Sequence, residues 1–488
     1  MPTTEFKRIA TIKSPAEFRA HCAGLGIRLD CDDSIVAGAD SPLRQPLEVQ
    51  GRVIGNRWTA QPMEGWDCTL DGHATESVVR RWRRFGESGA KLIWGGEAMA
   101  VRADGRANPN QLMIDADHAD DLRYLRQTLL DAHCTRYGRV DDLLIGFQLT
   151  HSGRFCRPLP DHKPYPRIAY RHPLLDQRVG ITDSGPVFTD KELAELVQDY
   201  VRAAVVAQRV GADFVDIKHC HGYLLHELLS AHTRPGPYGG SLENRTRMLR
   251  EIVSGIRAEA PDLLIGVRVS AFDFVPFRPA WRDADGKLGP GQPEEHSALL
   301  PYQYAFGANP MNPTEPDPAE PIQLLEMLRA MGVRLVNITA GSPYYCPHVQ
   351  RPAMFPPSDG YQPPEDPLVG VARQIGVTRE LKARFPDLLL VGTGYTYLQE
   401  YLPNVAQHNV RMGYVDSVGI GRALLAYPDV LAVATETGRI DRRLLCRTFS
   451  DCTTGPRMGL PSGCYPLDPY YKGSPQAPRL RALAKGRR

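Results

Sequence analysis

The chain has 488 residues, of which 42% are hydrophobic and 23% charged, and its formal net charge is +2. This content excludes a disordered chain, and the balanced charge gives no broad field that would attract nucleic acid or an anionic membrane. We therefore expect a globular protein whose partner is a small molecule. The sequence contains neither an apolar run of about 18 residues nor the apolar core of a secretory signal, so we expect no membrane span and a cytoplasmic location.

Residues 1–45 mix short apolar pieces with Pro, Asp and Gly, and residues 16–25 are predicted to form one helix. We expect this N-terminal extension to pack on the main domain. From residue 46 to residue 432, predicted strands alternate with predicted helices. The strands cover residues 52–60, 90–99, 143–148, 213–217, 264–269, 335–338, 388–391 and 417–419, and the helices cover residues 77–85, 119–133, 190–210, 245–260, 321–331, 367–385 and 397–409.

Eight strands that alternate with helices predict an α/β fold, a (β/α)8 TIM barrel over residues 46–432. A doubly wound sheet gives the same alternation over fewer units. The sequence contains no convincing G-x-G-x-x-G motif that opens a helix after a strand, which argues against a Rossmann dinucleotide domain.

Three segments exceed the minimal barrel. Residues 271–320 form a long loop after the fifth strand, rich in Pro and Gly, and a shorter excursion at 342–366 follows the sixth strand. Loops at the C-terminal ends of barrel strands carry the active sites of this fold. The aromatic residues of 271–320 therefore indicate a lid-like insertion over the catalytic face. Residues 433–488 form a C-terminal extension that contains cysteines.

Four ionisable side chains lie close together in sequence at the end of the predicted fourth strand. The buried strand at 213–217 runs into Lys218, His219, His221 and Tyr223. A buried strand has no structural need for Lys or paired His, because each must be desolvated and matched with a partner. This cluster therefore predicts an active site. His219 is expected to point to the opposite face of the strand and to be a satisfied buried histidine.

Glycines at two neighbouring strand ends predict a phosphate site. Gly392, Thr393 and Gly394 end the seventh strand, and Gly421 and Arg422 follow the eighth. Backbone N–H groups at such turns approach an anion closely, and an arginine adds a charge-assisted hydrogen bond. The pair of turns is more informative than either turn alone.

Three motifs in order carry a family resemblance: His-Gly-Tyr-Leu at 221–224, Tyr-Gly-Gly-Ser-Leu-Glu-Asn-Arg at 238–245 and Gly-Val-Arg-Val-Ser at 266–270. With them the chain resembles the old yellow enzyme family of flavin oxidoreductases, as an atypical branch with links to trimethylamine dehydrogenase and 2,4-dienoyl-CoA reductase. The resemblance implies a TIM barrel that binds FMN, takes electrons from NADH or NADPH, reduces electron-poor alkenes and assembles as a homo-oligomer.

The resemblance also implies roles for individual residues. His221 and Lys218 occupy the positions at which members of the family bind the substrate carbonyl oxygen. Tyr223 occupies the position of the tyrosine that donates a proton to the substrate. The two glycine turns and Arg422 would hold the FMN phosphate. The flavin ring would be lined by Pro62, Met63, Glu64, Ala98, Gln148 and Arg268. An internal salt bridge with Asp216 or Asp273 is the alternative reading of Arg268.

Two positions depart from the family pattern. Lys218 replaces a histidine, and Glu64 replaces a residue that is often Thr or Cys. A carboxylate beside the flavin disfavours the reduced, anionic form unless it is protonated or paired. We therefore hypothesise that Lys218 pairs with Glu64. A lysine at this place also allows Schiff-base or general-base chemistry.

The C-terminal extension carries Cys446, Cys452 and Cys464, and Phe449 stands between the first two. The cluster-bearing branch of the family has a four-cysteine iron–sulfur motif after the barrel, and Phe449 occupies its missing position. We expect a lapsed site without metal, in which the three cysteines are thiols. A [4Fe–4S] cluster on three thiolates, or zinc on three Cys and a distant His, is the alternative.

These observations predict an FMN-dependent, NAD(P)H-consuming reductase of an activated C=C bond. Flavin-dependent oxidation, as in the amine-oxidising relatives, is the first alternative. A barrel lyase that uses Lys218 without flavin is the second.

Overall fold

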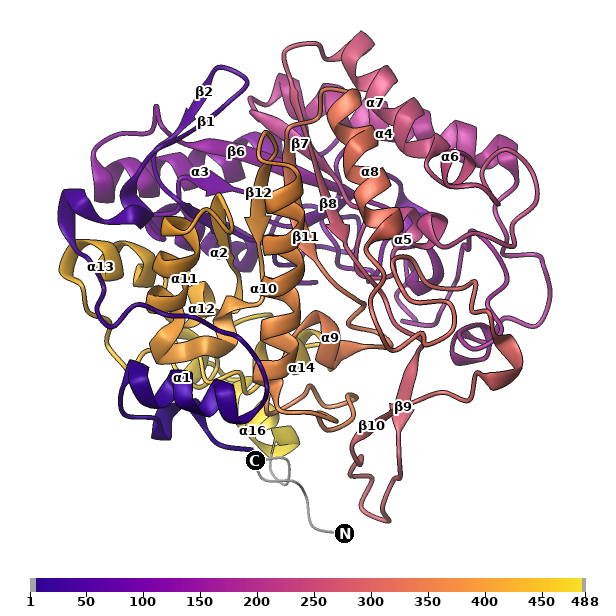
Figure 1. Cartoon of the computed structure of the whole chain (residues 1–488). Helices are drawn as coiled ribbons and strands as arrows, with labels where there is room; N and C mark the ends of the chain where they lie inside the picture. The colour runs from indigo at the N-terminus through magenta and orange to yellow at the C-terminus, as the bar shows by residue number, and fades with distance from the viewer. Residues whose placement is uncertain (1–5, 485–488) are drawn as a thin grey trace.

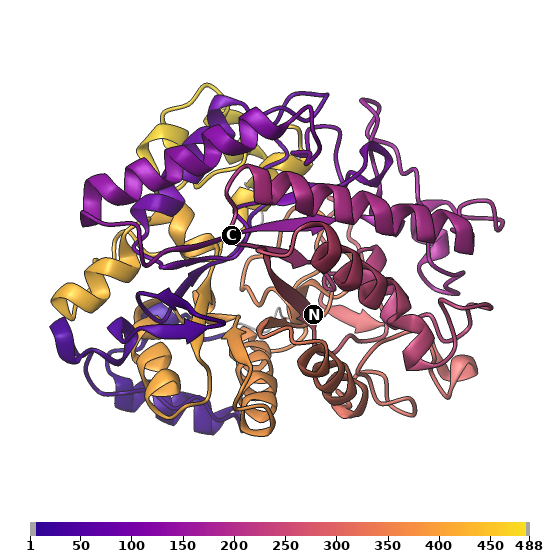
Figure 2. The ribbon, with the colours of Figure 1, turned by 90° about the horizontal axis from the view of Figure 1, so that it is seen from above.

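The computed structural model describes residues 6–484, and their strands form a closed parallel barrel with helices around it (Figures 1 and 2). The predicted (β/α)8 architecture is confirmed. The barrel strands are β3 (Trp58–Ala60), β4 (Leu92–Ile93), β5 (Ala98–Ala100), β6 (Leu144–Thr150), β7 (Phe214–Ile217), β8 (Leu264–Ser270), β11 (Leu335–Thr339), β12 (Leu389–Gly392) and β13 (Ser417–Ile420).

The ring closes because β3 pairs in parallel with both β13 and β4, while β4 also pairs with β6. The second barrel position is divided between β4 and β5, where we predicted one strand. Gly95 and Gly96 interrupt it with φ values of 143° and 59°. A side chain at Gly95 would lie 2.8 Å from Gln148, so the close approach to β6 requires glycine.

The helices follow the predicted ranges closely. Thr189 and Glu192 form a capping box at the start of α4, and Asp366 caps α10, which begins with a proline. The predicted helix 397–409 is divided, because a 3₁₀ segment ends at Tyr401 and α11 begins beside Pro403. The helices are α1 (Pro15–Gly24), α2 (Glu76–Glu87), α3 (Ala119–Tyr137), α4 (Asp190–Arg209), α5 (Leu224–Leu229), α6 (Leu242–Arg245), α7 (Arg247–Glu259), α8 (Ala319–Ala330), α9 (Pro347–Gln350), α10 (Pro367–Arg384), α11 (Leu402–Arg411), α12 (Arg422–Ala426), α13 (Val430–Thr437), α14 (Asp451–Arg457), α15 (Pro469–Lys472) and α16 (Ala477–Ala484).

A hairpin closes the N-terminal end of the barrel. The predicted first strand, 52–60, is wrong in its first half: β2 (Arg52–Ile54) pairs with β1 (Leu47–Val49), and only Trp58–Ala60 joins the barrel. Gly55 allows this change of direction, since a side chain there would overlap Asp142. Val49 and Ile54 pack on the residues that begin the barrel strands, so the active site must open at the opposite end (Figure 1).

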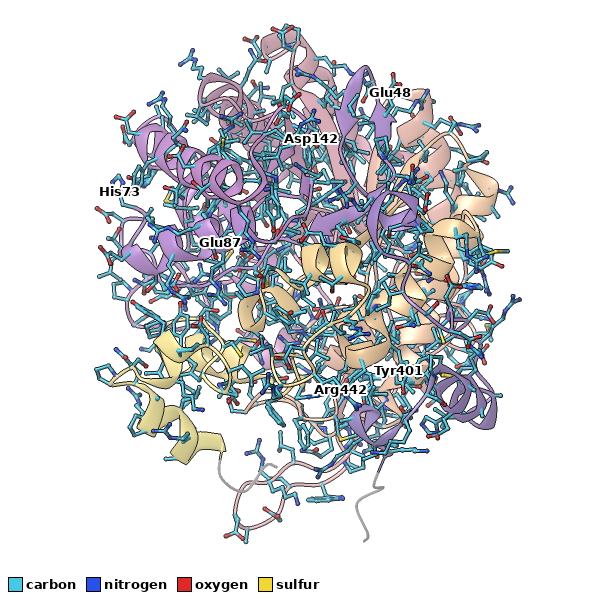
Figure 3. The ribbon with its side chains drawn as sticks, turned by 90° about the vertical axis from the view of Figure 1, so that its left-hand side faces the viewer. Glu48, His73, Glu87, Asp142, Tyr401 and Arg442 are labelled. Carbon is cyan, nitrogen blue, oxygen red and sulfur yellow. The ribbon has the colours of Figure 1, made fainter. Side chains whose placement is uncertain are left out.

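The N-terminal extension packs beside the 3₁₀ segment and α11. The ring of Phe18 stacks on Tyr401 with centroids 4.6 Å apart, and the Tyr401 hydroxyl donates to the Ile12 carbonyl. Arg442 donates to the Ala10 carbonyl, and Figure 3 shows Tyr401 and Arg442 at the end of the molecule away from Glu48 of the hairpin. Residues 1–5 of the predicted extension lie outside the described residues, as do residues 485–488 of the C-terminal one.

The insertion at 271–320 forms a projecting hairpin and a packed segment. Strands β9 (Phe277–Pro279) and β10 (Gly291–Pro293) pair antiparallel (Figure 1). Tyr302 and Phe306 are buried, and Tyr304 packs against the ring of His172. Within residues 6–484, no helix is long and apolar enough to cross a membrane.

Candidate active site

A cavity of about 250 Å³ opens at the C-terminal ends of the barrel strands. Of the catalytic and cofactor-binding residues predicted for the site, all except Gly392 line it. The predicted residues that line it are Pro62, Met63, Glu64, Ala98, Gln148, Lys218, His221, Tyr223, Arg268, Thr393, Gly394, Gly421 and Arg422. Gly392 is buried at the end of β12.

The predicted lid is not what covers this cavity. No residue of 271–320 lines it; the wall comes instead from the excursion after β11 and from the C-terminal extension, including Tyr344, Arg351, Cys452 and Thr453. Tyr302 and Phe306 of this segment are buried without lining the cavity, which explains the difference. The insertion reaches the wall indirectly, because Asp273 accepts a hydrogen bond from the Tyr345 hydroxyl.

Lys218 and Glu64 form the ion pair that the sequence led us to expect. Lys218 Nζ lies 3.2 Å from Glu64 Oε1 and 4.0 Å from the centre of the Tyr223 ring. Glu64 Oε2 accepts a hydrogen bond of 2.8 Å from Trp66 Nε1. The two departures from the family pattern are thus joined by direct contact, and the amine of Lys218 is not a free nucleophile.

Tyr223 is held in the same network. Its hydroxyl lies 3.3 Å from Glu64 Oε2 and 2.9 Å from the Tyr344 hydroxyl. Burial, followed by the charge of Glu64, raises the pKa of Tyr223 well above its ordinary value. The hydroxyl therefore keeps its proton at neutral pH.

His221 follows a sharp turn at the end of β7. Its φ is 69°, in the left-handed region that residues other than glycine rarely adopt, so this strand end is strained. Burial, and then the charges of Arg268 and Lys218, lower the pKa of His221 well below its ordinary value, so the ring is neutral. Its Nε2 lies 3.3 Å from the Gln350 amide nitrogen.

His219 behaves as the sequence predicts. It is buried, is absent from the cavity wall, and its Nδ1 lies 2.9 Å from the Ile217 carbonyl. Burial lowers the pKa of His219 to about 4. It is a satisfied buried histidine.

Arg268 faces the cavity without the salt bridge considered as its alternative. Its backbone N–H donates to Asp216 Oδ1 at 2.6 Å, while Gln148 Nε2 donates to Asp216 Oδ2 at 2.6 Å. Among the described residues, no carboxylate lies within ion-pair distance of the Arg268 guanidinium, and its buried Nε has no hydrogen-bond partner. Asp216 thus orders Gln148 and the backbone of β8.

The charge of the wall favours an anionic ligand. Lys218, Arg268, Arg351, Arg422 and Arg457 line the cavity, whereas Glu64 is its one carboxylate among the residues that the structure describes. Opposite charges lower the free energy of a bound anion most where water is excluded. A cavity of this kind suits a ligand that carries phosphate.

Unpartnered buried atoms test whether the residues fit FMN. Within the described part of the chain, three lining residues carry a buried nitrogen without a partner: Arg268 Nε, Arg351 Nη2 and Arg422 Nη1. Buried donors are normally paired, so these three indicate a ligand that accepts hydrogen bonds and carries negative charge. Gly394, with φ of 95°, lines the cavity together with Arg422. The residues present fit FMN.

The cysteines of the extension are free thiols. Cys446, Cys452 and Cys464 form no disulfide, and burial raises the pKa of Cys446 and Cys464. No group of three or more His, Cys, Asp or Glu side chains within residues 6–484 is arranged to hold a metal ion. The structure therefore gives the iron–sulfur and zinc alternatives no support.

Sequence reasoning missed part of the wall. Gln350, Arg351 and Thr453 were not predicted as site residues, although they line the cavity. Gln350 and Arg351 belong to the excursion after β11, whose place at a C-terminal strand end was the available signal. Thr453 could not have been found, since it reaches the site only through tertiary folding of the extension.

About half of this chain is similar in sequence to known flavin oxidoreductases. Residues 42–281 match the model of the NADH:flavin oxidoreductase / NADH oxidase family. A NADH:flavin oxidoreductase from Gibberella zeae is 30% identical over 252 residues, and a NADPH dehydrogenase from a Geobacillus species is 32% identical over 247 residues. Each match covers 49% of this chain, and it spans 59% of the first relative and 65% of the second.

A solved structure shares the fold over most of the chain. The complex of 2-naphthoyl-CoA reductase with 2-naphthoyl-CoA superimposes with a TM-score of 0.62 at 18% identity. The match covers 91% of this chain and 58% of that one.

Proposed function

We propose, on the premise that residues 42–281 belong to the NADH:flavin oxidoreductase / NADH oxidase family, that this protein is an FMN-dependent oxidoreductase. It takes hydride from NADH or NADPH and delivers it to a carbon–carbon double bond activated by a carbonyl group. One observation carries the proposal: Tyr223, His221 and Lys218 face the same cavity as the unpartnered arginines Arg268 and Arg422.

The residues that would hold the cofactor come from separate strand ends. Arg268 would face the flavin pyrimidine, with Gln148 fixed beside it by Asp216. Gly394, Gly421 and Arg422 would hold the phosphate. When bound, FMN supplies hydride transfer between the nicotinamide donor and the substrate.

The protein's own part in the reaction is to bind the substrate oxygen and to deliver a proton. Neutral His221 and the Lys218 ammonium would donate hydrogen bonds to the substrate carbonyl, where negative charge develops as hydride arrives. The Tyr223 hydroxyl would protonate the α-carbon. The Tyr344 hydroxyl, 2.9 Å away, would return a proton to Tyr223.

The reductive direction is supported by the proton held on Tyr223 and by the names of two of the relatives, a NADPH dehydrogenase and a reductase. An oxidative enzyme would need a base where Tyr223 holds its proton. The lyase alternative lacks support, because Lys218 Nζ is engaged by Glu64.

Anaerobic mixing of the purified holoprotein with NADH or NADPH tests the proposal. Rapid loss of the visible flavin absorbance, followed by its return on addition of an activated alkene, is the expected result. A colourless protein that takes up no FMN would contradict it.

A further inference from the structure

A second arginine, Arg351, lines the cavity near Arg422. Arg351 follows α9, on the excursion after β11, and it lines the cavity together with Arg422. Each carries a buried nitrogen without a hydrogen-bond partner, Nη2 in Arg351 and Nη1 in Arg422. Within residues 6–484, no carboxylate lies within ion-pair distance of either guanidinium. The nearby Asp359 carboxylate forms an ion pair with Arg457.

Two buried like charges without a counter-ion are unfavourable. Burial, and then the charge of Arg422, lower the pKa of Arg351, and burial lowers the pKa of Arg422. Such a pair is retained where an anion with more than one negative charge binds between its members, because each guanidinium then gains a charge-assisted hydrogen bond.

The loop that carries Arg351 is tied to the glycine turn after β12. Gln374 Nε2 donates to the Val349 carbonyl at 2.6 Å and to the Gln350 carbonyl at 3.0 Å. Gln374 Oε1 accepts from Thr393 Oγ1 at 2.9 Å. One side chain therefore fixes the start of the Arg351 loop against the turn expected to bind phosphate.

The C-terminal extension completes this arrangement. Arg351 Nη1 donates to Thr453 Oγ1 in α14, and the Ser358 N–H donates to Thr454 Oγ1 at 3.2 Å. Cys452 beside Thr453 also lines the cavity. The segment that carries the three cysteines thus lies against the loop after β11 and orients Arg351.

We propose that Arg351 is a second phosphate-binding residue, which contacts the flavin phosphate together with Arg422 and is positioned there by Thr453 of the C-terminal extension. The proposal rests on the proposed function, because the phosphate is that of bound FMN.

Flavin binding to the full chain, freed of bound cofactor, separates the phosphate from the ring. The dissociation constants of FMN and of riboflavin, which lacks the phosphate, are measured by quenching of flavin fluorescence. Arg351→Met is expected to weaken FMN binding by about 10- to 100-fold, the range for a lost charge-assisted hydrogen bond, and to leave riboflavin binding unchanged. Arg351→Lys should recover part of the FMN affinity, and Thr453→Val should cause a smaller, FMN-specific loss.

The matched control is Arg373→Met, since Arg373 is paired with Glu365 and does not line the cavity. It should bind both flavins as the unaltered protein does. Unchanged FMN affinity in Arg351→Met would overturn the proposal, and so would an equal loss for FMN and riboflavin, which marks a structural role. If the unaltered protein binds neither flavin, the proposed function itself fails.

Discussion

At the scale of single residues, Glu64 and Lys218 depart from the family pattern together. Glu64 Oε1 lies 3.2 Å from Lys218 Nζ, so removal of one partner leaves the other charge unpaired in a buried site. Both side chains line the cavity expected to hold the flavin. The pair was predicted from the family resemblance together with chemistry, because the resemblance places Glu64 beside the flavin and a carboxylate there needs compensation.

Lys218→Met tests the compensation. Because the unpaired carboxylate disfavours the anionic reduced flavin, the midpoint potential should fall by about 30 mV or more, about 1.4 kcal/mol for the two-electron couple. The double variant Lys218→Met/Glu64→Gln should return toward the original potential. Equilibrium titration against redox dyes measures all three proteins, and identical potentials would refute the coupling.

Tyr223→Phe removes the proposed proton donor and keeps the ring beneath Lys218. Re-oxidation of the reduced enzyme by an activated alkene should slow by about 100-fold or more, while reduction by NAD(P)H is retained. Stopped-flow measurement of the two half-reactions separates these effects. Tyr238→Phe is the matched control, because its hydroxyl also bonds a glutamate, Glu251, but it does not line the cavity. Equal slowing of both half-reactions would contradict the assignment.

At the scale of elements, the barrel strands and helices could be predicted because their hydrophobic periodicity is local. The errors lie where a tertiary contact decides the path, as at Gly55 beside Asp142 and at Gly95 beside Gln148. The prediction that residues 271–320 form a lid was wrong for the same reason. Their aromatic content suggested a lid, but Tyr302 and Phe306 are buried and do not line the cavity.

The insertion contributes a buried carboxyl that affects stability. Burial raises the pKa of Asp273 from 3.8 to about 7, and the Tyr345 hydroxyl donates to it. Because the folded pKa is above the unfolded one, the stabilisation is fully present below about pH 4 and is lost as pH rises toward 7. This group alone contributes a slope approaching 1.4 kcal/mol per pH unit in that window.

Asp273→Asn should remove this component, so the free energy of unfolding should depend less on pH between about 4 and 7. Urea unfolding at a series of pH values provides the measurement, and Asp283→Asn, in an exposed turn of the same segment, is the control. If the free energy of unfolding changes with pH in the same way for Asp273→Asn and the unaltered protein, folding does not raise the pKa of Asp273.

At the scale of the whole molecule, both extensions lie at the C-terminal end of the barrel, while the hairpin β1–β2 closes the other end (Figure 1). Most site residues were predictable, since motifs fix Tyr223, Arg268 and Arg422 to strand ends. The role of the C-terminal extension could not be predicted. Its cysteine spacing suggested a lapsed metal site, and no local signal shows that α14 reaches Arg351. We expect the extension to belong to the cofactor site.

The most direct test of the central claim is anaerobic double-mixing stopped-flow absorbance of the FMN-loaded protein. The first mix with NADPH or NADH should bleach the flavin, and the second mix with an α,β-unsaturated carbonyl compound should restore its colour with formation of the saturated product. Flavin that no nicotinamide donor bleaches, but that an amine substrate reduces, would contradict the account and establish the oxidative direction.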